Sequence, residues 1–128
     1  MDTAITHDIL VCVETFYQPA HSDPRKGEHF FAYRITIENL GPHTVQLLRR
    51  HWHIVECDGS AREVEGEGVV GQQPVLEPLQ KHRYVSGCQF HGEVGLMYGT
   101  FLMKRAVDGH RFEATIPHFT MVVPHKLN

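Results

Sequence analysis

Apolar and polar residues alternate with a period of two along most of this 128-residue chain. In residues 29–39 every second side chain from Phe31 to Ile37 is apolar, and the residues between them are mostly small or polar. Successive side chains of a β-strand point to opposite faces, so this pattern indicates a strand with one buried face and one wet face. No ten-residue stretch shows the 3.6-residue apolar stripe of a helix. Short strands separated by turns predict an all-β sandwich or barrel.

The other expected strands follow the same rule. In residues 8–17 the apolar positions begin at Ile9, and in residues 44–57 the apolar phase shifts, which predicts a β-bulge near Arg49 and Arg50. Residues 18–28 are expected to form an exposed loop. Later strands are predicted at 82–90, 95–107, 111–116 and 119–123, with Pro117 interrupting the last two.

Composition limits the classes of function. Hydrophobic residues make up 41% of the chain, charged residues make up 21%, and the formal net charge is −3. These values predict one folded domain over residues 1–128 and argue against disorder and against general binding to nucleic acid. No membrane span or basic leader is expected. The three cysteines are far apart and form no C-x-x-C pair, which favours a cytoplasmic chain with free thiols.

Gly66, Gly68 and Gly71 have the G-x-G-x-x-G spacing of dinucleotide-binding loops. That use of the motif requires a helix that begins among the glycines, because its N-terminal amides hold the pyrophosphate. Here Pro74 and Pro78 follow, and each would cost about 3 kcal/mol inside a helix. No Lys and Ser/Thr pair follows the last glycine either, so the dinucleotide-fold and P-loop interpretations are both rejected.

Three weaker hypotheses for this segment are left. Loop amides could form an anion-binding nest for a small anionic ligand. Glu63, Glu65 and Glu67 would project from one face of an extended strand, where they would repel a polyphosphate but could weakly bind a divalent cation such as Mg²⁺. The favoured interpretation is a charged edge strand that resists aggregation, with glycines that permit a bulge and a tight turn.

Other side chains give weaker signals. His51, His53 and Cys57 share strand parity and could bind Zn²⁺ or Co²⁺, but three ligands on one strand span too far, and exposed histidines are the preferred interpretation. The stretch around Trp52 could stack a base or bind a phosphate, although a packed tryptophan flanked by exposed cations is favoured. No catalytic constellation is found, and neither catalytic residues nor a cofactor are expected.

The order of the motifs resembles the ApaG family. The resemblance is carried by FAYRITIENLG, VQLLRRHWHIVECDG, VEGEGVVGQQPVLEP, YVSGC, GLMYGTFLM and RFEATIPHF. It implies an immunoglobulin-like or fibronectin type III-like β-sandwich in a bacterial protein whose loss affects cobalt resistance and magnesium efflux. Related domains serve protein–protein recognition in some F-box proteins and in a polymerase-delta-interacting protein. The chain departs from the family pattern at Leu79, where glycine is usual, and at 91–94, where many members have Thr-Pro.

These observations predict a non-enzymatic binding module connected to divalent-cation homeostasis, acting on a protein partner or a small ligand. The candidate binding residues are Gly66, Gly68 and Gly71, with Arg49, His51 and Trp52. Gly68→Val should abolish recognition if the loop backbone must approach a partner. One alternative is a nucleotide- or pyrophosphate-binding protein or enzyme that uses the same loop. Another is a direct Mg²⁺ or Co²⁺ sensor that uses the three glutamates. Pairing of edge strands would give a homodimer.

Overall fold

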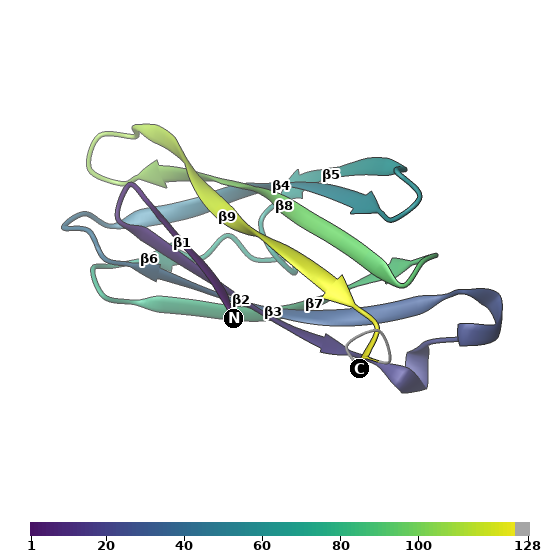
Figure 1. Ribbon diagram of the computed structural model, residues 1–128. Coiled ribbons are helices and arrows are strands. Elements are labelled where there is room, and N and C mark those ends of the chain that lie inside the picture. The colour runs from purple at the N-terminus through teal and green to yellow at the C-terminus, as the bar shows by residue number, and fades with distance from the viewer. Residues whose placement is uncertain (125–128) are drawn as a thin grey trace.

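The alternating strands form two antiparallel sheets that face each other, in a computed structural model that describes residues 1–124 (Figure 1). Residues 125–128, which the expected domain includes, lie outside the described residues. The first sheet has the order β1 (Asp2–Thr6), β2 (Ile9–Tyr17), β3 (His29–Asn39) and β7 (Lys81–Phe90). The second has the order β5 (Ala61–Glu67), β4 (Val45–Glu56), β8 (Val94–Arg105) and β9 (Arg111–Val122), and β6 (Val75–Leu76) pairs with β4. The all-β fold is confirmed as a sandwich, not a barrel.

The inner faces of the two sheets make the core. The apolar positions from Phe31 to Ile37 are buried, as their alternation predicts. Trp52 on β4 is only 3% exposed and packs against Tyr33 of the facing sheet, with ring centroids 5.5 Å apart, and against Phe119 at 5.8 Å. The interpretation of Trp52 as a packed side chain is therefore confirmed.

A β-bulge decides which face each residue of β4 occupies. The register with β8 shifts between Leu47 and Arg49, within two residues of the predicted position. The extra residue changes the side-chain parity of the strand. As a result Leu47 and Trp52 both point inward, and Arg50 shares the inner face while Arg49 points outward.

Two expectations about the strands need correction. The segments on either side of Pro117 form one strand, β9, whose register with β8 shifts between Met97 and Gly99. A bulge accommodates proline because the missing N–H is not needed in the ladder there. The strand β1 was not predicted, since it is short and mostly exposed. It joins β2 through His7 and Asp8, which both have positive φ.

The two sides of the sandwich differ in the contacts that join the sheets. On one side β1 packs against β9, and the amide of Thr115 donates to Thr6 Oγ1 at 3.3 Å. On the other side the edge strands β5 and β7 belong to different sheets, and Arg62 of β5 reaches across to Cys88 Sγ at 3.2 Å and to the carbonyl of Gln89 at 3.0 Å. The 18–28 loop holds two short 3₁₀ turns, η1 (Pro19–His21) and η2 (Pro24–Lys26). None of the helices in residues 1–124 has the length and apolar character to cross a membrane.

Candidate functional site

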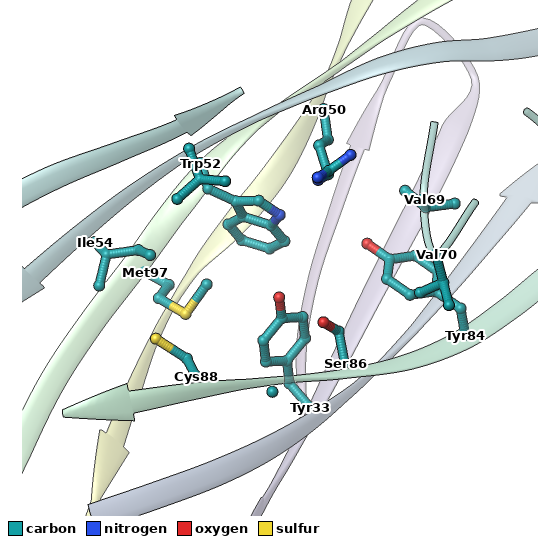
Figure 2. A pocket seen from close by; sticks show the side chains of 12 residues that line it. Tyr33, Arg50, Trp52, Ile54, Val69, Val70, Tyr84, Ser86, Cys88 and Met97 are labelled. Carbon is teal, nitrogen blue, oxygen red and sulfur yellow. The ribbon is translucent and has the colours of Figure 1, made fainter. Parts of the chain in front are cut away.

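A cavity of about 330 Å³ lies between the sheets, next to the side that β5 and β7 leave open (Figure 2). Its walls come from both sheets and from the loop after β5, so residues far apart in sequence meet there. Most of the lining is apolar or aromatic. The lining residues are Tyr33, Arg50, Trp52, Ile54, Val64, Val69, Val70, Tyr84, Ser86, Gly87, Cys88 and Met97.

The hydroxyl of Tyr84 is the least satisfied polar group in this cavity. It is buried and has no hydrogen-bond partner among residues 1–124. Burial raises the pKa of Tyr84 well above its ordinary value, Tyr33 raises it further, and the charge of Arg50 opposes the rise. A buried hydroxyl without a partner destabilises a protein by about 1–3 kcal/mol. An acceptor brought into the cavity would satisfy this group.

Arg50 supplies positive charge at the same place (Figure 2). Its Nη1 donates to the carbonyls of Glu67 at 3.0 Å and Gly68 at 3.1 Å. These bonds anchor the guanidinium through one nitrogen, and the fork retains donors for a ligand. Burial raises the pKa of Tyr33, while its hydrogen bond with Ser86 and the charge of Arg50 oppose that rise. No carboxylate occurs among the residues that line the cavity in the described part of the chain.

The glycine segment forms the rim of the cavity and contains no helix, which confirms that it is not a dinucleotide loop. Val69 and Gln72 exchange backbone hydrogen bonds of 2.8 and 3.0 Å around Val70 and Gly71, whose φ values are 47° and 76°. Two positive φ values in a row are typical of a tight type I′ hairpin turn. Gly68 has a φ of 63°, and a Cβ there would collide with the carbonyl oxygen of Gln72.

Three amides of this segment already donate to backbone carbonyls. The amide of Gly68 donates to the carbonyl of Leu48 at 2.9 Å, and the amides of Val69 and Gln72 are used inside the turn. These three amides are therefore already used, and the side chains beneath the loop offer further donors for an anion.

The three glutamates lie on the other face of β5. Glu63, Glu65 and Glu67 are the register partners of His53, His51 and Arg49 on β4. The sheet separates these carboxylates from the cavity. Their predicted repulsion toward an anion thus does not apply to a ligand bound between the sheets.

Comparison with known proteins identifies the family. A family model described as the ApaG domain matches residues 19–105. A protein ApaG from Brucella canis is 43% identical over 126 residues, which cover 98% of this chain and 96% of that protein.

The chain belongs to the ApaG family.

Other members agree in sequence and in fold. A protein ApaG from Parvibaculum lavamentivorans is 42% identical over 98% of this chain and 95% of its own length. The crystal structure of a Bordetella pertussis protein that carries the name ApaA superposes with a TM-score of 0.88 at 39% identity, covering 91% of this chain and 94% of that one. Another X-ray structure, solved as structural genomics target SoR45, also has a TM-score of 0.88, at 36% identity and over 98% of this chain. None of these relatives is named for a catalytic activity.

The structure divides the predicted binding residues of this ApaG-family chain between two faces. Trp52 lines the cavity and Gly66 contacts Arg50, whereas Arg49 and His51 point to the outer face. The predictions missed Arg50, Tyr84 and Ser86. Arg50 could have been found from the bulge, because the shifted phase puts an arginine in line with Trp52 and Ile54. Tyr84 and Ser86 carried no signal, since nothing in the sequence places β7 opposite β4.

Proposed function

We propose that this protein is a non-enzymatic binding module that takes a small anionic ligand into the cavity between its sheets. The observation that carries the proposal is the buried, unpartnered hydroxyl of Tyr84 beside the guanidinium of Arg50. The ligand would connect the protein to divalent-cation homeostasis, as the family resemblance implies. A cytoplasmic location is part of the same proposal.

The side chains that line the cavity indicate which class of ligand it would bind. A guanidinium fork suits a carboxylate or a phosphate, and a neutral phenol donates one more hydrogen bond. The charge of Arg50 acts in surroundings that are largely apolar, where it interacts more strongly than in water. A volume of about 330 Å³ is at the lower end for ligand pockets, so a small anion with a short apolar part fits best.

One observation still supports the nucleotide or pyrophosphate alternative. In its proposed receptor, the Gly66–Gly71 loop, the amides of Gly68 and Val69 already donate to backbone carbonyls, but the loop borders the cavity through Val69 and Val70. A pyrophosphate would therefore contact Arg50 from the rim. Inorganic phosphate and pyrophosphate are accordingly the two probes of choice.

The test is a residue-resolved NMR titration of the labelled protein with each probe separately. Saturable shifts at Tyr33, Val69, Tyr84 and Ser86 are expected. They should weaken by at least about tenfold in Arg50→Gln, since a charged hydrogen bond contributes about 1.5–3 kcal/mol. Arg49→Gln is the matched control, because it removes the same charge from the outer face of the same strand and should leave the affinity unchanged.

Flat titrations at millimolar probe, or equal losses in the two arginine variants, would remove the cavity from the proposal. The function would then rest on a protein partner. Shifts that follow Arg49 and not Arg50 would place the anion on the outer face. Sedimentation of the unliganded protein tests the homodimer separately.

A further inference from the structure

The outer face of the second sheet carries a cluster of side chains that the cavity does not use. His51 and His53 occupy neighbouring outward positions on β4, and Glu63 lies opposite them on β5. One donor atom from each of the three lies within 4.8 Å of the others. All three side chains are accessible to solvent, with exposed fractions of 35%, 32% and 62%.

Three ligands on one strand would span too far to bind a single ion, but the antiparallel pairing of β4 with β5 supplies one ligand from the neighbouring strand. Cys57 shares parity with the histidines in the sequence, but β4 ends at Glu56 and Cys57 lies in the following turn. The register instead places Glu63 directly across from His53. Directly paired side chains on adjacent strands have Cβ atoms about 5 Å apart, close enough to share an ion.

Two of the three donor separations already suit a shared ion. Glu63 Oε1 lies 3.2 Å from His51 Nε2 and 3.2 Å from His53 Nδ1. In a tetrahedral site with metal–ligand bonds of about 2.1 Å, donor atoms are about 3.4 Å apart. Small side-chain rotations would therefore bring the three donors onto one ion.

Neighbouring groups hold the imidazoles in position. His51 Nδ1 lies 3.1 Å from Glu65 Oε1, so Glu65 can accept a proton from Nδ1 when Nε2, which lies 3.2 Å from Glu63, binds an ion in place of its hydrogen bond. His53 stacks on Tyr98 with ring centroids 4.8 Å apart and 9° between the planes, and Tyr98 stacks in turn on His118. A carboxylate behind a ligating histidine and a packed ring are the usual supports of metal sites.

We propose that His51, His53 and Glu63 bind one late first-row divalent metal ion of the Zn²⁺, Ni²⁺ or Co²⁺ type, with water completing the coordination. Two imidazoles select such ions over Mg²⁺, which prefers oxygen ligands only. The site differs from the predicted three-glutamate site, because Glu67 lies opposite Arg49 in the strand register and Glu65 contacts the other ring nitrogen of His51. It is separate from the cavity and goes beyond the function proposed above.

Calorimetric titration of the full chain with Zn²⁺ tests the proposal, with Mg²⁺ in a parallel run. One equivalent of Zn²⁺ is expected to bind, and millimolar Mg²⁺ is expected to give no saturable heat. His53→Gln and Glu63→Gln should each weaken Zn²⁺ binding by at least about tenfold. Glu67→Gln on the same face and His82→Gln on the opposite sheet are the controls and should leave it unchanged, which separates this site from general binding to a chain with 11 histidines.

Substitution with Co²⁺ gives a second readout, because intense visible absorption bands identify a low-coordinate nitrogen and oxygen site. Those bands should be absent in the His51→Asn, His53→Gln double variant. Zn²⁺ affinity that survives in the double variant, or falls equally in His82→Gln, would overturn the proposal. Thermal unfolding of each metal-free variant checks that the fold is retained. Retention is expected because these side chains are accessible to solvent.

Discussion

Gly66 on β5 and Arg50 on β4 fit together only because residue 66 has no side chain. A Cβ at position 66 would lie 2.9 Å from both terminal nitrogens of the guanidinium. Without it, Arg50 lies across β5 and reaches the carbonyls of Glu67 and Gly68. Position 66 of the G-x-G-x-x-G motif therefore needs glycine because the guanidinium of Arg50, which gives the cavity its positive charge, lies where a Cβ would be.

Gly66→Ala should therefore displace the guanidinium without unfolding the protein. The collision involves the far end of a flexible side chain, so the free energy of unfolding should fall by no more than about 1 kcal/mol. Affinity for phosphate should fall to that of Arg50→Gln. In the double variant the two effects should not add, which a double-mutant cycle of NMR titrations measures. Additive losses would show that Gly66 acts independently of Arg50.

Gly68→Val should destabilise the fold itself, so a loss of recognition in that variant cannot be assigned to a ligand contact. A side chain there would meet the backbone of Gln72 and would have to adopt a φ of 63°. We expect a loss of about 2–4 kcal/mol in urea denaturation. Gly71→Ala has open space around it and should lose only about 1 kcal/mol. Equal effects at the two positions would contradict this account.

Leu79→Gly should make the protein more stable. Leu79 follows Pro78 in a turn closed by a hydrogen bond of 3.0 Å from the Gln80 amide to the Glu77 carbonyl, and it has a φ of 70°. This conformation destabilises a residue with a Cβ by about 1–2 kcal/mol, and glycine adopts it freely. Thermal denaturation should show a gain of about 1 kcal/mol for Leu79→Gly and none for Leu79→Ala, which keeps the Cβ. The glycine that the family resemblance implies at this position would have the same physical explanation.

Asn39→Ala should be among the most destabilising changes at a polar residue. Its buried amide donates to the carbonyls of His43 at 2.8 Å and Leu76 at 3.0 Å, and its Oδ1 accepts from the amide of Gly41. Truncation would leave these backbone groups without a partner at about 2–4 kcal/mol in total. Gln46→Ala removes one exposed hydrogen bond to Gln73 and should change the free energy of unfolding by less than about 0.5 kcal/mol.

Tyr84 should make stability fall at alkaline pH. Its pKa is raised in the folded protein, so between about pH 10 and the folded value the unfolded chain has lost a proton that the folded chain retains. Stability is therefore fully present below pH 10 and decreases above it, by up to about 1.4 kcal/mol per pH unit for one phenol. Tyr84→Phe removes this contribution, so its stability should fall less steeply from pH 10 to 11. The same variant should be as stable as the parent or more stable at pH 7, because it removes an unpartnered hydroxyl.

The sequence alone determined the strand class, the buried positions from Phe31 to Ile37, the bulge on β4 and the rejection of a dinucleotide loop. These features depend on residue parity and on the preferences of proline and glycine, which are local properties of the chain. The buried asparagine shows where local reasoning ends. The strand indicated over residues 29–39 does end at Asn39, but the bond from Asn39 to Leu76 links residues that are distant in sequence.

Only the tertiary structure decided what the candidate residues face. The bulge turned Arg50 inward and Arg49 outward, the pairing of β4 with β5 brought Glu63 to the two histidines, and the packing of the sheets placed Tyr84 opposite Arg50. Strand order and register are set by long-range packing of the whole core, and a one-residue slip would have moved every one of these side chains to the other face. The sites of this protein follow from that register, and the sequence pattern of a single strand does not contain it.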